Sequence, residues 1–140
     1  MSTRADKLTS NLKKDLFYSD FLINLDKHPL NGSLAKTTNE NAVKQAIRNL
    51  ILTDIYERPY QPQMGSKFHS LLFEPMNELT VPLLERTIED TIRLFEPRAT
   101  LRFVKVTPVE ARNEYNINIV FSLVNSIGDI QLDLIIKRIR

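Results

Sequence analysis

The fold class is decided by residues 101–137, LRFVKVTPVEARNEYNINIVFSLVNSIGDIQLDLIIK. In this stretch apolar and polar residues alternate, which is the period of a strand with one buried face. The apolar members of the three successive runs are Leu101, Phe103, Val104 and Val106; Tyr115, Ile117, Ile119, Phe121 and Leu123; and Ile130, Leu132, Leu134 and Ile136. Turn-forming residues separate the last two runs, at Asn125–Asp129. The pattern predicts a C-terminal antiparallel β-meander.

Upstream of these strands the period changes to that of a helix. Thr37 with Glu40 matches a capping box, which would start an amphipathic helix. The apolar residues at helical spacing are Val43, Ala46, Ile47, Leu50, Ile51 and Ile55. The first main helix is therefore expected from about residue 37.

Two further helices are predicted between prolines. Ser66 can cap a short helix whose buried side carries Phe68, Leu71 and Leu72 and which ends at Pro75. Thr80 is the expected N-cap of a longer helix, with Pro82 in its first turn. The buried face of that helix comprises Leu84, Ile88, Thr91, Ile92 and Phe95, and Pro97 stops it.

The N-terminal end divides into a polar arm and the start of the folded part. Residues 1–14 are expected to be a flexible arm, and residues 15–140 a single domain. Phe17 to Leu25 reads as a strand that leads into a turn at 28–32. The fold class is therefore α+β: an N-terminal strand or hairpin, two main helices plus a short helix, and a C-terminal antiparallel β-meander.

Composition excludes several classes of function. The 140 residues are 42% hydrophobic and 26% charged, which suits one soluble globular domain. The longest apolar runs, such as Leu50–Leu52, are far too short to cross a membrane, and the polar N-terminal residues lead us to expect no secretory signal. A net charge of +2 argues against nucleic acid as a partner. With no cysteines, three glycines and only His28 and His69 as histidines, we expect no cofactor, no metal and no small-molecule substrate.

Three local motifs each join a charge to a proline: ERPYQPQMG at 57–65, SLLFEP at 70–75 and FEPR at 95–98. Glu96 lies at the C-terminal end of the second main helix, where the helix dipole disfavours a carboxylate unless a cation compensates. Arg98 is the nearest cation. It could pair with Glu96 on the surface, which is worth about 0–1 kcal/mol, or offer its planar fork to another chain. The residues alone leave both interpretations open.

Taken in order, these motifs resemble the baseplate wedge family of contractile phages. That family includes the sheath initiator of phage tails and its type VI secretion counterpart, and the similarity covers roughly residues 17–137. This chain departs from the family pattern at Tyr56, where members carry glycine, and at Met64, where they carry an aromatic residue. Both departures lie in the 57–65 loop or next to it.

The resemblance implies a structural role in the tail baseplate of a virion, assembled in the host cytoplasm. It implies that Glu96, Pro97 and Arg98, together with Glu57 and Arg58, contact neighbouring wedge proteins that form a helical core bundle. Tail tube or hub proteins are further candidate partners.

The resemblance also implies that the C-terminal strands, about 114–137, imitate part of the tail sheath protein and initiate the sheath. The predicted partner-binding residues there are Ile130, Leu132 and Leu134. A terminal strand exposes N–H and C=O groups that another chain can extend. The alternative is that Ile130–Ile136 only closes this chain's own sheet, with Lys137, Arg138 and Arg140 guarding the edge.

Proteins of this kind have also been called lysozyme-like, which makes a cell-wall hydrolase the rival hypothesis. A glycosidase needs two carboxylates at one cleft, one of them with a raised pKa. The candidate acids are Glu74, Glu78, Glu85, Glu89, Asp90 and Glu96. Glu85 and Glu89 are expected on the exposed side of their helix, and no acid has an apolar setting, so we expect no catalytic residue and no enzyme. A cytoplasmic adaptor is a third, weaker alternative.

Overall fold

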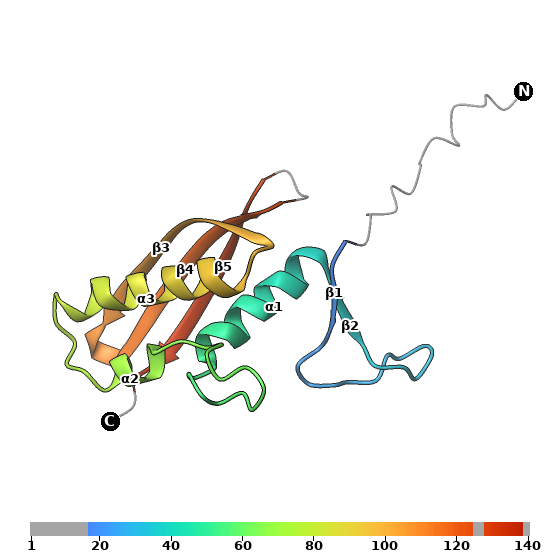
Figure 1. Ribbon diagram of the computed structural model, residues 1–140, viewed down its shortest axis with the longest axis horizontal. Helices are drawn as coiled ribbons and strands as arrows, with labels where there is room; N and C mark the ends of the chain where they lie inside the picture. Colours follow the sequence, from blue (N-terminus) through green and yellow to red (C-terminus); the bar gives the residue numbers. More distant parts are fainter. Residues whose placement is uncertain (1–16, 125–127, 139–140) are drawn as a thin grey trace, which may run out of the picture.

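The computed structural model describes residues 17–124 and 128–138, so the arm predicted for residues 1–14 and most of the turn predicted at 125–129 lie outside the described residues. Figure 1 shows the order of the elements along the chain. They are β1 (Ser19–Phe21), β2 (Lys36–Thr38), α1 (Asn39–Leu52), α2 (Phe68–Leu72), α3 (Thr80–Phe95), β3 (Ala99–Val109), η2 (Glu110–Arg112), β4 (Glu114–Leu123) and β5 (Asp129–Lys137). The α+β class is confirmed.

The C-terminal meander is the central sheet. It is a three-stranded antiparallel sheet in the order β3-β4-β5, as predicted from the alternation. Ile117 of β4 lies opposite Val106 of β3 and Leu134 of β5, so these apolar side chains share one face. The pairing shifts once, between Leu101 and Phe103 of β3, which marks a β-bulge.

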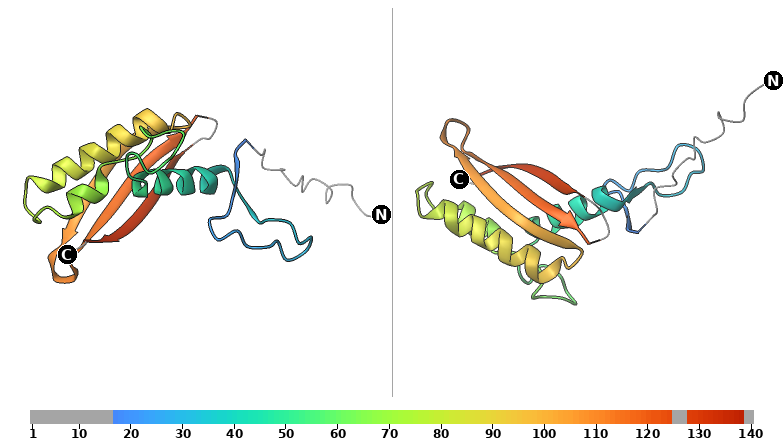
Figure 2. Two further views of the ribbon diagram at one scale, coloured as in Figure 1. Left: turned by 60° about the horizontal axis from the view of Figure 1, so that its bottom comes forward. Right: turned by 90° about the horizontal axis from the view of Figure 1, so that it is seen from above.

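The helices cover one face of this sheet. Figure 2 shows α1 and α3 on the same side, with α3 running along β3. The core joins the inward residues of the strands to those of the helices, and its fully buried members include Ile47, Ile51, Phe68, Leu84, Ile88, Tyr115, Ile119 and Phe121. Between them, the outward residues of β4, such as Asn116 and Asn118, stay accessible. The sheet thus has one buried and one open face.

The first helix forms where its apolar period predicts, except that it ends at Leu52 and leaves Ile55 outside. The predicted capping box is wrong. Thr37 lies in β2 opposite Asp20, so its side chain is not at a helix start. Thr38 is the N-cap and makes no side-chain capping bond. Asn39 instead joins the helix to the residues just before β1, because its Oδ1 accepts hydrogen bonds from the backbone N–H groups of Phe17 and Tyr18. The helix start is thus fixed by the strand beside it.

The start of α3 also differs from the prediction, by one residue. Thr80 is the first helical residue and not the N-cap. Asn77 takes the capping role, since its Oδ1 accepts hydrogen bonds from the N–H groups of Leu79 and Thr80. The predicted buried face is confirmed for Leu84, Ile88, Thr91 and Ile92, whereas Phe95 is only partly buried.

The N-terminal strand is real but short. β1 and β2 form an antiparallel hairpin of three residue pairs, from Ser19↔Thr38 to Phe21↔Lys36. None of residues 17–36 is buried, although the segment carries several large apolar side chains. The exposed ones are Phe17, Phe21, Ile23, Leu25, Leu30 and Leu34. Figure 1 shows this hairpin projecting from the body of the domain.

Within the part of the chain that the structure describes, no helix has the length and apolar character needed to span a membrane.

Candidate partner-binding site

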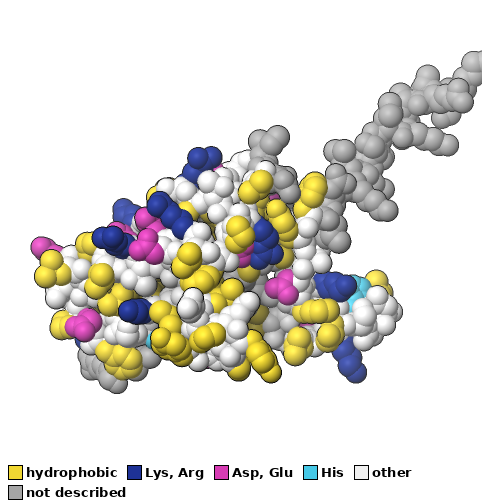
Figure 3. All heavy atoms as spheres, viewed as in Figure 1, with side chains coloured by type: hydrophobic (Ala, Val, Ile, Leu, Met, Phe, Trp, Pro, Cys, Tyr) yellow, Lys and Arg dark blue, Asp and Glu magenta, His cyan; other side chains and the backbone are white. Residues whose placement is uncertain are grey.

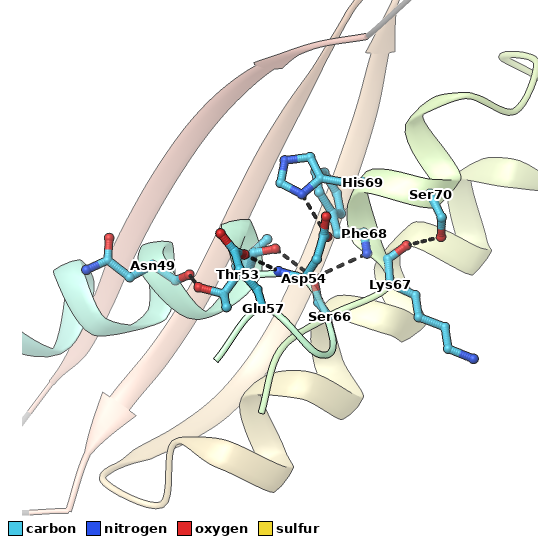
Figure 4. A network of polar contacts seen from close by, with 10 residues as sticks. Asn49, Thr53, Asp54, Glu57, Ser66, Lys67, Phe68, His69 and Ser70 are labelled. Atoms are coloured by element: carbon cyan, nitrogen blue, oxygen red, sulfur yellow. Dashed lines mark hydrogen bonds and ion pairs between the residues drawn. The ribbon is translucent and has the colours of Figure 1, made fainter. Parts of the chain in front are cut away.

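The motif loop after α1 is fastened to the helix by Ser66 (Figure 4). The Ser66 hydroxyl donates to the carbonyl of Ile51 at 2.6 Å, and the Ser66 N–H donates to the carbonyl of Thr53 at 2.8 Å. The same hydroxyl accepts a hydrogen bond from the N–H of Phe68, the first residue of α2. Ser66 therefore satisfies free carbonyls at the end of α1 and supports the start of α2. It is not the predicted N-cap, because Lys67 occupies that position, and α2 ends at Leu72, before Pro75.

Gly65 permits this close approach. A Cβ at this position would lie 2.7 Å from the carbonyl carbon and oxygen of Asp54, and the φ of Gly65 is +152°. Both the space and the backbone conformation exclude a larger residue. The ends of the loop are consequently in direct backbone contact.

Tyr56 adopts a left-handed conformation, with φ of 74°. Its N–H donates to the carbonyl of Pro62 at 2.7 Å, so the conformation closes the loop. A side chain with a Cβ costs roughly 1–2 kcal/mol in this region. This is the position where the resembled family carries glycine, and the chain keeps a glycine-like conformation despite the tyrosine.

Glu57 and Arg58, two of the predicted partner-binding residues, both shape the loop. A Glu57 carboxylate oxygen accepts the N–H of Asp54 at 2.9 Å. An Arg58 terminal nitrogen donates to the sulfur of Met64, also at 2.9 Å. Both side chains remain exposed. Arg58 has further donors, because a guanidinium carries five N–H groups.

A shallow groove separates this loop from the C-terminal half of α3. Its lining residues are Tyr60, Gln61, Pro62, Gln63, Met64 and Phe95. A neighbouring hollow continues it past Gln63 and Phe95 toward Ile55 and Leu94. Tyr60 is 98% exposed and Leu94 is 73% exposed. Figure 3 shows hydrophobic side chains on the surface where this loop projects.

The corner after α3 holds a bidentate ion pair. The Arg98 Nε and Nη2 atoms donate to the two carboxylate oxygens of Glu96 at 2.6 and 2.7 Å. Glu96 is only 5% exposed. The hydrogen bonds from Arg98 to this carboxylate raise the pKa of the guanidinium above its ordinary value, against an opposing effect of burial. The guanidinium also lies over the ring of Tyr18, 5.6 Å from the ring centre.

The pairing of Arg98 with Glu96, one of the two interpretations open from the sequence, is present, but it is not a surface contact, because the carboxylate is buried. The pair also links the residue just before β1, Tyr18, to the α3–β3 corner. Sequence reasoning missed Tyr18, whose position next to Arg98 depends on tertiary structure alone.

Other residues weighed from the sequence lie elsewhere. The His69 ring contacts the Asp54 carboxylate at 2.9 Å near the loop. Residues 17–124 and 128–138 contain no group of three or more His, Asp or Glu that could hold a metal. Glu85, expected on the exposed side of its helix, is half-buried and accepts the N–H of Val106 at 2.8 Å.

Comparisons with known proteins show which family the chain belongs to. A family model described as baseplate wedge protein gp25 matches residues 37–126. The chain belongs to this baseplate wedge family. Baseplate wedge protein gp25 of Enterobacteria phage T4 is 31% identical over 101 residues, which span 72% of this chain and 76% of that protein.

Two solved structures have the same fold as this wedge protein. One is in the baseplate of the anti-feeding prophage, with 25% identity and a TM-score of 0.68, covering 79% of this chain and 89% of that one. The other, from Geobacter sulfurreducens, bears a name that proposes a tail lysozyme; it has 25% identity and a TM-score of 0.67 and covers 72% and 92% of the two chains. The protein is a structural component of a contractile-tail baseplate wedge.

The C-terminal residues predicted to bind partners occupy another part of the wedge protein. The side chains of Ile130 and Leu134 are buried in the core, and Leu132 packs against it. The Arg138 N–H donates to the Asn113 carbonyl, which shows that the backbone groups of Arg138 point toward β4. Because the direction alternates along the strand, the backbone groups of Ile130, Leu132 and Leu134 also point toward β4. The groups that face outward belong to Gln131, Asp133, Ile135 and Lys137. Sequence analysis identified the strand but not these residues.

Replacing Arg98 tests the buried pair of this wedge protein. Arg98→Ala leaves the Glu96 carboxylate buried without its cation, so the free energy of unfolding should fall by about 2–3 kcal/mol in urea denaturation. A surface pair worth about 0–1 kcal/mol would instead leave the fold nearly intact. Arg93→Ala is the control, because Arg93 meets Glu89 on an exposed helix face at 3.7 Å and should change stability by less than about 0.5 kcal/mol. Equal effects of the two variants would contradict the assigned role of Arg98.

Replacing Tyr56 tests the loop strain. Tyr56 is 80% exposed, so Tyr56→Gly removes little packing. It relieves the left-handed conformation and should raise the free energy of unfolding by roughly 0.5 kcal/mol, after the added chain entropy is subtracted. Tyr60→Gly serves as the control, since Tyr60 has no positive φ and should lose stability from chain entropy alone. If Tyr56→Gly destabilises as much as Tyr60→Gly, the strain is absent.

Proposed function

We propose that this wedge protein acts without catalysis, by binding neighbouring wedge proteins at one surface and starting the sheath at another. The observation that carries the first part is the apolar groove between a rigid loop and α3. Its walls are held by Ser66 and Gly65, so a partner would meet a preformed surface. Preformed surfaces bind at a lower entropic cost than mobile ones.

The neighbour-binding surface comprises the groove together with the residues Glu57, Arg58, Pro97 and Arg98. Glu96, predicted from the sequence to contact a partner, is buried and instead holds the Arg98 guanidinium in place. Phe95 lines the groove and directly precedes Glu96, which places the corner beside it. Aromatic and arginine residues are the types that contribute most at protein interfaces. A partner with an apolar ridge and acidic or carbonyl groups at its rim suits this arrangement, and the helical bundle implied by the family resemblance offers such a ridge.

The proposed sheath-initiating surface is the free edge of β5. This strand is nine residues long and pairs with β4 without interruption from Ser122↔Asp129 to Glu114↔Lys137. Gln131, Asp133, Ile135 and Lys137 turn their backbone groups away from β4. An extended segment of a sheath subunit could continue the ladder there.

The geometry favours no hydrolytic function. One hollow brings Glu78 and Glu110 together, but both side chains are exposed to solvent. A general acid needs burial that raises its pKa. Glu96 and Glu114 are buried, but each faces an arginine. Arg98 donates to both oxygens of Glu96, and Arg112 lies 3.6 Å from a carboxylate oxygen of Glu114. The acids therefore serve structural or surface roles.

Charged substitutions in the groove test the neighbour-binding role. Tyr60→Asp and Leu94→Asp change exposed side chains, so both proteins should fold, yet neither should enter baseplates. Incorporation is measured by mass spectrometry of purified particles made with each variant. Leu79→Asp is the matched control, because Leu79 is 81% exposed on the opposite end of α3 and should enter normally. Normal incorporation of the two groove variants would disprove this surface.

Proline on β5 tests the sheath-initiating role. Gln131→Pro removes an outward N–H and no bond to β4, so the protein should fold and enter baseplates but fail to start the sheath in electron micrographs. Gln131→Ala loses the same side-chain contact with Asp133 and keeps the N–H, so its tails should be sheathed. Folded Gln131→Pro protein that builds normal sheathed tails would rule out strand addition at this edge.

A further inference from the structure

We infer that the second edge of the sheet, on β3, is blocked by Glu85 and Pro108, so that strand addition is confined to β5. The inference rests on the proposed sheath-initiating role of β5. It adds a source of specificity. Strand addition at β5 places the sheath segment correctly only if the same segment cannot add to the β3 edge instead.

The direction of the β3 backbone follows from two contacts. The Val124 N–H donates to the carbonyl of Arg98, which fixes the alternation at one end of the β3–β4 ladder. The Val106 N–H donates to Glu85 of α3, which shows that Val106 faces away from β4. Along an antiparallel strand, the backbone N–H and C=O groups of successive residues point alternately toward the paired strand and away from it. The backbone groups of Val104, Val106 and Pro108 therefore all point toward the free edge of β3.

These outward positions offer a partner few donors. The Val106 N–H is already bonded to the Glu85 carboxylate at 2.8 Å. Pro108 has no N–H. At the other end of the strand, the Ala99 N–H donates to the carbonyl of Glu96 at 3.2 Å.

The bulge disrupts what is left of the edge. It shifts the pairing between Leu101 and Phe103, so the outward residues on its two sides, Leu101 and Val104, are three positions apart. A regular added strand needs donors at every second residue. A bulge also increases the local twist of an edge and so discourages pairing.

β5 has none of these features. Its register with β4 is continuous, and no proline occurs between Asp129 and Lys137. No described side chain takes up the outward N–H groups of Gln131, Asp133, Ile135 or Lys137 in the way Glu85 takes up that of Val106. The two edges of the sheet therefore differ: the β5 edge can pair with an added strand, and the β3 edge cannot.

The test restores donors to β3 and measures self-association. Glu85→Ala frees the Val106 N–H, and Pro108→Thr supplies the missing donor at an exposed position. The double variant should associate at concentrations roughly tenfold or more below those at which the wild-type chain does, measured by analytical ultracentrifugation of the purified full chain. Glu85→Gln keeps an acceptor oxygen of the same shape and should behave as the wild type.

A second series carries Gln131→Pro in every variant, which removes β5 as a route to association. Association that persists in this background supports the block on β3. A double variant that is folded by circular dichroism and as monomeric as the wild type overturns it. This measurement of self-association uses no sheath protein. The sheath-initiating role is tested separately, in tails made with Gln131→Pro alone. Failure of that role is therefore distinguished from failure of this inference.

Discussion

The one-sided burial of a three-stranded sheet is the constraint on which the rest of the molecule depends. A sheet of this size is stable only if one face packs against other elements, and here α1 and α3 supply that packing. Covering the sheet from one side brings the C-terminal end of α3 to the start of β3. It also places Glu85 within reach of the β3 edge. The buried Glu96–Arg98 pair and the blocked edge both follow from the position of α3.

The periodic parts of the sequence predicted the fold well, for a physical reason. Ile117 and Ile119 repeat every second residue because a strand exposes alternate faces, and Ile88 and Ile92 repeat every fourth because a helix turns once in about 3.6 residues. Helix starts were less predictable. Thr37 has the residue type of a cap, but pairing with Asp20 in a strand took precedence.

The sequence predicted which segments form the candidate site, but it did not predict the conformation or burial of the residues in them. The proline-bounded motifs marked the loop and the corner, since proline and glycine restrict the backbone locally. Whether Glu96 is buried depends on how α3 meets β3, which no local pattern encodes. The left-handed Tyr56 is similar: its residue type argues against that conformation, and only closure of the loop on Pro62 enforces it. On β5 the alternation identified the residues with buried side chains. An added partner strand would instead form hydrogen bonds with the backbone of the residues between them.

The N-terminal hairpin has a consequence for the dynamics of the molecule. Of residues 17–36, none is buried, and Tyr18 is the member that packs on the core. Opening this segment would expose little apolar surface, so its opening free energy lies well below that of global unfolding. Amide hydrogens in the hairpin would then exchange with solvent through local opening while those of β4 exchange only with the whole domain. On this argument the hairpin is a separate and less stable cooperative unit, and its exposed apolar side chains, such as Leu30, are carried by the part of the domain that opens first.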